Sequence, residues 1–303
     1  MHILEYLLVR ALLTFYQCLS YKGALAVARF LARLATKVDA KPRARSIANL
    51  QLIFGDALDQ VQRERITRGS YESISRHVAE VAHIGRQRGR NLVIENGEMV
   101  RELYARGRGV IAVSAHMGPF VRMAMVPKLL GIRVAAVMKK QDNQMVHNWG
   151  RTYVREQFDI QTFLKKDARG MVEDLLKEGY LVGLFADQHP RSGGFPCSFF
   201  GRQVLAAAGP AIYAKRCGSP LVVVTAVPRG DEIVLRWEGP VDTDGTHEEI
   251  SQRWMSILED RIRDYPETWT WMHRRWRDKE APDIREVADA ALAASKGRQT
   301  VQT

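Results

Sequence analysis

Two segments with catalytic side chains directly follow apolar, β-rich stretches of the chain. His116 comes after Val110–Ser114 (VIAVS), and Asp187 and Gln188 come after Leu181–Ala186 (LVGLFA). A histidine at the carboxyl end of a strand lies at the edge where open α/β sheets bind ligands. Its imidazole can take a proton from a hydroxyl, and a carboxylate can orient it during that step. Taken singly, each segment also fits a structural role, as a strand-end histidine or an aspartate that caps a turn.

Basic side chains form two further candidate sites. Asn143 and Asn148 precede Arg151, and Arg155 follows one helical turn later, so both guanidinium groups share a helix face. Such groups can bind a phosphate or carboxylate, although the spacing is also typical of a solvated basic face. The segment Trp269–Arg277 combines three tryptophans, three arginines and a histidine. It would suit a membrane interface or base stacking, but no nucleic-acid-binding motif accompanies it, and no nucleic-acid partner is expected.

An α/β fold must position these segments. Short apolar runs predict strands at 110–114, 134–138, 181–186, 221–227 and 233–237. Helical patterns lie near 60–86, 120–130, 144–158, 168–178, 205–217 and 248–264. Continuous apolar strands separated by helices predict a central, mostly parallel sheet flanked by helices.

The stretch Pro190–Arg202 (PRSGGFPCSFFGR) is interpreted as a flexible segment that becomes aromatic and then basic. Its phenylalanines, Phe195, Phe199 and Phe200, could contact an acyl chain or a bilayer if they are exposed, although such side chains more often belong to a core.

Residues 3–35 are the most apolar stretch and predict a membrane-associated helical segment. A helix that spans a membrane needs about 20 nearly uncharged residues. Arg10 and Lys22 bracket an uncharged run that is too short for this. The basic residues within one quadrant of a helical wheel are Lys22, Arg29, Arg33 and Lys37. An amphipathic helix with a basic stripe suits the surface of an anionic bilayer, so lying on the membrane is preferred to spanning it. The alternative is a helical hairpin that packs on the domain.

Composition indicates a globular protein that binds anionic partners. The chain has 303 residues, 46% of them hydrophobic, and 45 Lys and Arg against 34 Asp and Glu give a net charge of +11. Such an excess favours nucleic acid, anionic lipid, phosphorylated substrates or an acidic carrier protein, and charge alone does not choose among them. Three widely spaced cysteines, Cys18, Cys197 and Cys217, suit neither a disulfide framework nor a metal site.

Several motifs occur in a fixed order along most of the chain. They are Arg43–Phe54, Ser114–Gly118, Asp142–Asn143 with Trp149–Arg151, Phe185–Gln188, Phe199–Arg202, Gly209–Pro210 and Tyr265–Trp276. In this order they resemble the motifs of the lysophospholipid-acyltransferase superfamily. More narrowly, the chain is similar to the bacterial lipid A secondary acyltransferases, the lauroyl and myristoyl transferases.

The resemblance implies an O-acyltransferase at the cytoplasmic face of the inner membrane. The enzyme would move a fatty acyl group from acyl carrier protein to a hydroxyl of a lipid A precursor or related phosphorylated glycolipid, without a cofactor. The implied catalytic residues are His116, Asp187 and Arg151, and the implied substrate-binding residues are Asn143, Gln188, Gly118 and Arg202. The expected organisation is a membrane-associated segment (1–38), an acyltransferase domain (39–280) and a loose tail (281–303).

The chain departs from the family at its central motif. There the histidine is followed, after four residues, by Asp or Glu, but this chain has Val121, with Arg122 beside it. Valine cannot balance an imidazolium, and an inward-pointing Arg122 would lower the basicity of His116. Because parallel strands end at one sheet edge, we expect Asp187 to supply the carboxylate, within about 3 Å of the imidazole. The alternatives are an impaired homologue that binds lipid or carrier protein, and an acyltransferase for another polar lipid.

Overall fold

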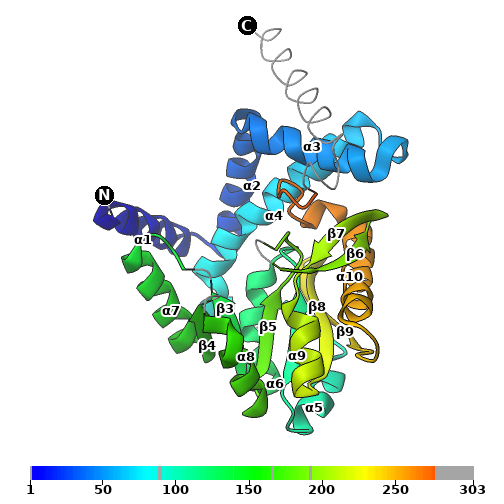
Figure 1. Cartoon of the computed structure of the whole chain (residues 1–303). Helices are drawn as coiled ribbons and strands as arrows, with labels where there is room; N and C mark the ends of the chain where they lie inside the picture. The colour runs from blue at the N-terminus through cyan, green and yellow to red at the C-terminus, as the bar shows by residue number, and fades with distance from the viewer. Residues whose placement is uncertain (1, 88–90, 139, 165–166, 191–192, 277–303) are drawn as a thin grey trace, which may run out of the picture.

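A seven-stranded sheet forms the centre of the computed structural model, which describes residues 2–276 except 88–90, 139, 165–166 and 191–192 (Figure 1). In spatial order its strands are β1 (Leu92–Glu95), β9 (Glu232–Val241), β8 (Leu221–Arg229), β2 (Val110–Ser114), β5 (Leu181–Phe185), β3 (Val134–Met138) and β4 (Ile160–Leu164). Neighbouring strands are parallel except for β8 and β9. The predicted fold class is therefore confirmed. The tail predicted at 281–303 lies outside the described residues.

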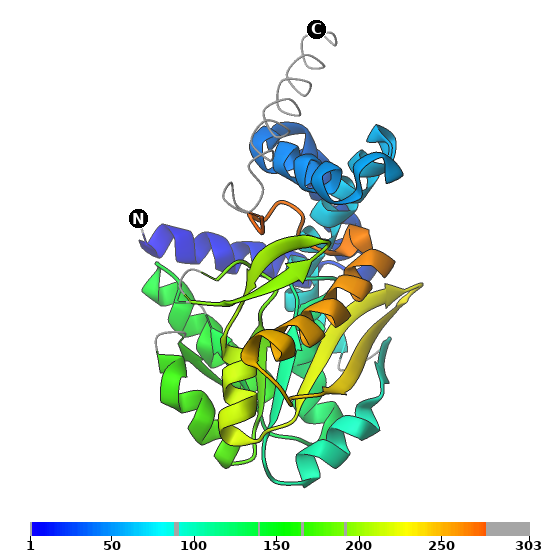
Figure 2. The same ribbon diagram turned by 45° about the vertical axis from the view of Figure 1, so that its right-hand side comes forward.

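Helices cover both faces of the sheet, which explains why its central strands are apolar throughout. On one face the core includes α8 (Ala168–Lys177), α9 (Gly209–Cys217) and α10 (His247–Asp264). On the other it includes α5 (Gly97–Ala105), the 3₁₀ segment η2 (Phe120–Met125), α6 (Val126–Leu130) and α7 (Gln144–Phe158). Figure 2 shows α9 and α10 across the near side of the sheet.

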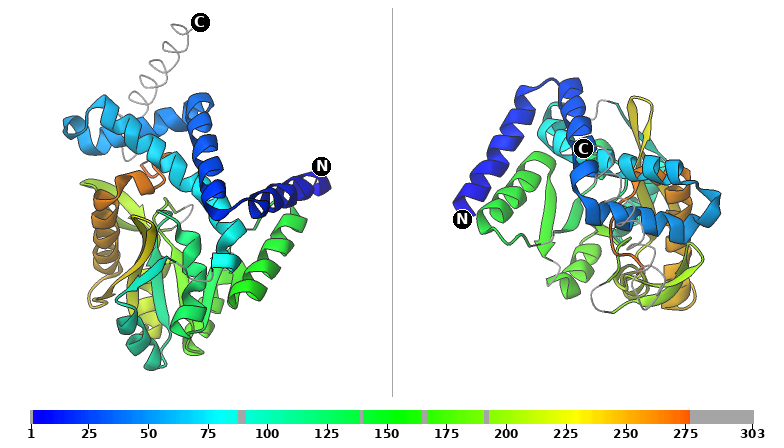
Figure 3. Two further views of the ribbon diagram at one scale, coloured as in Figure 1. Left: turned by 180° about the vertical axis from the view of Figure 1, so that it is seen from behind. Right: turned by 90° about the horizontal axis from the view of Figure 1, so that it is seen from above.

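The N-terminal stretch forms two helices rather than one. Helices α1 (His2–Cys18), α2 (Tyr21–Val38), α3 (Ala40–Phe54) and α4 (Gln60–Gln87) lie together over one end of the sheet (Figure 3). Ser20 separates α1 from α2 and caps α2 by accepting a hydrogen bond from the Gly23 amide (3.1 Å). Among the helices of the described residues, none is long and apolar enough to cross a membrane.

The segment interpreted as flexible is largely a β-hairpin. Strands β6 (Phe195–Phe199) and β7 (Arg202–Ala206) pair antiparallel, and Phe200 and Gly201 turn between them with positive φ angles. Phe199 and Phe200 are buried and belong to the core, which is the more common of the two roles that the sequence left open for them. The helix expected from residue 205 begins instead at Gly209, because residues 202–206 are used in pairing. Strands β1 and β4 were also not predicted.

The tryptophan-rich segment near the C-terminus belongs to the core. Trp269, Trp271 and Trp276 are each at most 2% exposed, and their rings pack against one another and against the hairpin phenylalanines. These side chains therefore cannot serve membrane contact or base stacking in this structure, and that interpretation is wrong. Their burial instead fixes the segment beside the carboxyl ends of the strands.

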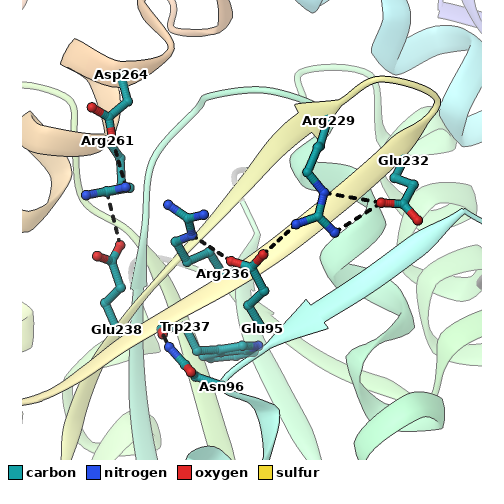
Figure 4. Close-up of polar contacts among 9 residues, drawn as sticks. All are labelled: Glu95, Asn96, Arg229, Glu232, Arg236, Trp237, Glu238, Arg261 and Asp264. Carbon is teal, nitrogen blue, oxygen red and sulfur yellow. Dashed lines mark hydrogen bonds and ion pairs between the residues drawn. The ribbon is translucent and has the colours of Figure 1, made fainter.

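An ion-pair cluster holds the β1 edge of the sheet. Glu95 of β1 accepts from Arg229 of β8 and Arg236 of β9, both at 2.8 Å (Figure 4). Arg261 of α10 pairs with Glu238 of β9 at 3.4 Å. The cations at this edge are thus satisfied within the fold.

Candidate active site

The chain leaves β2 in a tight turn that fixes the backbone of His116. Gly118 has a φ of +56°, and a Cβ there would lie 1.9 Å from the Ala226 carbonyl oxygen of β8. Only glycine fits so close to β8. The backbone therefore requires Gly118 whether or not this residue contacts substrate, as the resemblance implies. The Gly118 amide donates to the Thr268 carbonyl (2.9 Å), and the Thr270 hydroxyl donates to the His116 carbonyl (3.0 Å).

Asp187 follows β5, the parallel neighbour of β2, and binds His116 twice. Its Oδ1 lies 2.8 Å from His116 Nδ1, and its Oδ2 accepts from the His116 amide at 3.1 Å. Oδ2 also accepts from the Trp269 indole N–H at 2.9 Å. Because a carboxylate only accepts hydrogen bonds, the Nδ1 proton is held by Asp187, and Nε2 is the basic nitrogen. The expected contact between His116 and Asp187 is therefore present.

Burial and pairing have opposite effects on the pKa values of these two residues. Burial disfavours the charged imidazole, but the hydrogen bond and negative charge of Asp187 outweigh it and raise the pKa of His116 above its ordinary value. Burial also disfavours the Asp187 carboxylate, which is 1% exposed. Hydrogen bonds from His116 and Trp269, with the charge of His116, nevertheless keep the pKa of Asp187 below its ordinary value. The pair thus combines an ionised carboxylate with a strengthened base.

Aromatic rings surround His116, whose side chain is 32% exposed. The ring centroids of Phe185 and Phe120 lie 4.9 and 5.5 Å from that of His116. The ring of His77 of α4 packs on that of Phe120, with 4.1 Å between the centroids, and burial lowers the pKa of His77, which favours its neutral form. Such a wall can contact an acyl chain and exclude water from the base.

Val121, which stands where the family motif has an acid, and its neighbour Arg122 both make contacts within the fold. Val121 is half-buried and packs against the apolar core on one face of the sheet. Arg122 is buried, and its Nε lies 2.8 Å from Oε2 of the buried Glu80. Glu80 also accepts from Arg76 (2.8 Å) and from the Tyr21 hydroxyl (2.7 Å). Glu80 thus balances the charge of Arg122, and the pKa of His116 is raised rather than lowered.

Arg151 belongs to a different region of the molecule. With Arg155 of α7 and with Arg133, which precedes β3, it lines a cavity of about 850 Å³. Tyr180, just before β5, also lines this cavity, which therefore lies near the amino ends of the strands. His116 lies at their carboxyl ends and is absent from the described lining residues. A catalytic role of Arg151 stays a prediction.

The remaining predicted residues are placed individually by the structure. Gln188 is half-buried and directly follows Asp187. Asn143 caps α7 and donates to the His2 carbonyl (2.6 Å) and to Glu5 (3.0 Å) of α1. Arg202 lies in β7 and donates to the Leu52 carbonyl at 3.5 Å.

Two side chains of the site were not predicted from the sequence. Trp269 is 82 residues from Asp187, and no spacing signal connects them; only the fold brings its indole to the carboxylate. His77 lies on α4, which the sequence predicted only as a helical stretch near 60–86. Among the described residues, no three His, Cys, Asp or Glu side chains are grouped as metal ligands would be.

Comparison with known proteins assigns the chain to a family. The family model of bacterial lipid A biosynthesis acyltransferases matches residues 1–278. The chain is 26% identical to the lipid A biosynthesis lauroyltransferase of Escherichia coli (strain K12) over 249 residues, 76% of this chain and 78% of the relative. It is 25% identical over 193 residues to the lipid A biosynthesis palmitoleoyltransferase of the same organism, 61% of each chain. The chain therefore belongs to the bacterial lipid A biosynthesis acyltransferases, a family of transferases.

Proposed function

We propose that this protein transfers a fatty acyl group from acyl carrier protein to a hydroxyl of a lipid A precursor or a related phosphorylated glycolipid. The proposal rests on the 2.8 Å contact between His116 Nδ1 and Asp187 Oδ1 at the carboxyl edge of the sheet. The names of the relatives, a lauroyltransferase and a palmitoleoyltransferase of lipid A biosynthesis, support this choice of acyl group and acceptor.

The two residues would act as base and orienting acid. His116 Nε2 takes the proton of the acceptor hydroxyl while the oxygen attacks the carbonyl carbon of the donor thioester. Asp187 holds the imidazolium through Nδ1–H and remains ionised. When the intermediate collapses, the C–S bond breaks and the imidazolium returns its proton to the leaving thiolate. The products are an ester and the thiol of the carrier.

Asp187 would replace the carboxylate that the family motif has at position 121. The geometry favours this assignment because Asp187 already binds His116 Nδ1, the nitrogen that an orienting acid must occupy. His116 therefore has a carboxylate partner even though position 121 is a valine. This supports an active transferase over an impaired homologue.

Helices α1 and α2 would hold the protein on the cytoplasmic face of the inner membrane. Their exposed apolar side chains are Ile3, Leu4, Leu7, Leu8, Leu12, Phe15, Phe30, Leu31, Leu34 and Val38. Clustered apolar side chains of this kind are costly in water and mark surfaces that contact a membrane or another protein. Anionic membrane lipid would be a partner of this surface.

The acidic carrier protein would dock on the arginine-lined cavity. Arg133, Arg151 and Arg155 are exposed there, and Asp159 is the acid among them. Exposed cations steer an acidic partner more than they bind it tightly, which suits a carrier that must leave after each turnover.

Lipid analysis of cells tests the proposed reaction. Mass spectrometry of the lipids from cells with the wild-type protein should show a lipid A species that carries one further acyl group. His116→Ala should lower the rate of transfer by about 10³-fold or more, because the base is lost. If the additional acyl group appears on another polar lipid, that lipid is the acceptor instead of lipid A. Product formation that survives His116→Ala would contradict the mechanism.

A further inference from the structure

A groove runs between α2 and α4 and reaches Gly118 and Pro119 of the turn that follows His116. Two adjoining cavities, of about 800 and 510 Å³, share Gly69, Glu72 and Glu267 and form it together. Figures 1 and 3 both show α2 alongside α4. Among the described residues that line the groove, neither His116 nor Asp187 is included.

Basic side chains dominate the larger part of the groove. Arg33 and Lys37 of α2 face Arg65 and Arg68 of α4, and the acids are Glu72 and Glu267. Arg33 pairs with Glu72 at 3.4 Å. Arg65 and Arg68 are exposed, and within the described part of the chain neither has an ion pair or a hydrogen bond through its side chain. This differs from the β1 edge of the sheet, where the arginines are satisfied by carboxylates (Figure 4).

The same helix carries an exposed apolar face beside these cations. Phe30 and Val38 are 67% and 72% exposed, and Leu34 lies between them one helical turn from each. A third face of this helix, with Ala24, Ala28 and Ala32, is buried where α2 packs on α4. Since α2 thus presents a basic face and an apolar face side by side, a ligand that contacts both must have an anionic group next to an apolar chain.

The groove is also rigidly connected to the site. A Cβ on Gly69 would lie 2.5 Å from the Glu267 Cβ, so α4 and the 3₁₀ segment η4 (Pro266–Thr268) are in close contact there. Trp269, which follows η4 directly, donates to Asp187. A ligand in the groove would therefore lie on a wall whose position relative to the catalytic pair is fixed.

We propose that this groove binds the phosphate of an anionic phospholipid of the membrane, with Arg65 and Arg68 of α4 as its principal ligands and the lipid chains along Phe30, Leu34 and Val38. This site rests on the proposed membrane association and goes beyond it, because it adds α4 and a defined phosphate position. A free phosphate would share the polar chemistry but would make no use of the apolar face. The bound lipid would orient the catalytic edge with respect to the bilayer.

Vesicle binding by the full-length protein tests this site. The double variant Arg65→Gln, Arg68→Gln should bind vesicles of equal parts phosphatidylcholine and phosphatidylglycerol about 25-fold more weakly than wild type, at about fivefold per cation. Binding to pure phosphatidylcholine should be unchanged. The matched control Arg106→Gln, Arg108→Gln removes two exposed cations near the amino end of β2 and should change neither binding curve more than about twofold. The variant Arg65→Lys, Arg68→Lys keeps the charges and should retain most of the binding.

Several results would overturn the proposal. An equal loss in the control pair would show that net charge alone decides binding, and unchanged binding in the groove variant would show that the groove is not used. A rise in melting temperature with inorganic phosphate that needs Arg65 and Arg68, without any change in vesicle binding, would make this a site for free phosphate instead. Acyl transfer to detergent-dispersed acceptor is measured in parallel, since its absence in wild type would contradict the proposed reaction and not the groove.

Discussion

The charged side chains at the two ends of the sheet differ in burial and in pairing. At the carboxyl end, Asp187 is buried, accepts three hydrogen bonds and raises the pKa of His116. At the amino end, Arg151 and Arg155 are exposed on α7 and, among the described residues, make no side-chain ion pair or hydrogen bond. A buried, paired group can tune a reaction, whereas exposed cations attract an anionic partner and little more. This difference is consistent with the proposal that the reaction occurs at the carboxyl end and that the donor protein docks at the amino end.

The largest effect at the paired end is expected from Asp187→Asn. The amide cannot balance the imidazolium or hold the correct tautomer, and kcat should fall by about 10²- to 10⁴-fold. Since Asp187 raises the pKa of His116, the pKa of His116 should be lower in the variant than in wild type. Only the neutral imidazole is a base, so the acidic limb of the pH profile of kcat/KM should move to lower pH. The profile is measured with wild type and variant under one set of conditions.

Asp56→Asn provides the control for this comparison, because Asp56 is an exposed carboxylate of the N-terminal helical region. It should change neither kcat nor the pH profile. A fall in the rate of Asp187→Asn without any movement of the acidic limb would contradict the assignment of His116 as the titrating base.

The paired end of the sheet could be predicted from the sequence, and physical reasons explain why. His116 and Asp187 each follow an apolar run, and parallel strands end at a common edge, so two local patterns placed two distant residues together. A helical pattern over 144–158 also predicted α7 with its observed bounds. Trp269 could not be found this way, because its contact depends on the packing of the C-terminal segment rather than on a strand end.

The position of Arg151 near the amino ends of the strands could not be predicted, because the order of motifs does not say where along a helix a residue lies. Helix α7 leaves the carboxyl edge of the sheet at Asn143 and returns toward the amino edge. Arg151 is eight residues further on, about 12 Å along the axis at 1.5 Å per residue. The hairpin β6–β7 was missed for a different reason, since its glycines and proline obscured the alternation typical of strands.

A smaller effect is expected at the arginine-lined cavity. Arg151→Glu should raise KM for acyl groups carried by acyl carrier protein by about tenfold, with kcat nearly unchanged, because a rim charge affects association more than chemistry. Arg151→Lys keeps the charge and should have a smaller effect, since it loses only the bidentate geometry. With an acyl-pantetheine donor, which lacks the protein, both variants should match wild type. An equal loss with the small donor would place Arg151 at the reacting centre and remove the separation between the two ends.

The smallest effect on rate is expected from restoring an acid to the family motif. Val121→Glu places a carboxylate in a half-buried apolar setting, where desolvation should lower the free energy of unfolding by about 1–2 kcal/mol. Transfer should change by less than about twofold, because Asp187 already occupies His116 Nδ1 and a second acid has no vacant nitrogen to orient. Val121→Gln has the same size without the charge and serves as the control in both thermal unfolding and activity. A large gain in rate with Glu but not with Gln would mean that Asp187 supports the base only in part. The buried pair of His116 and Asp187 would then lack a second carboxylate, just as the exposed arginines at the other end of the sheet lack an anionic partner in the part of the fold that the structure describes.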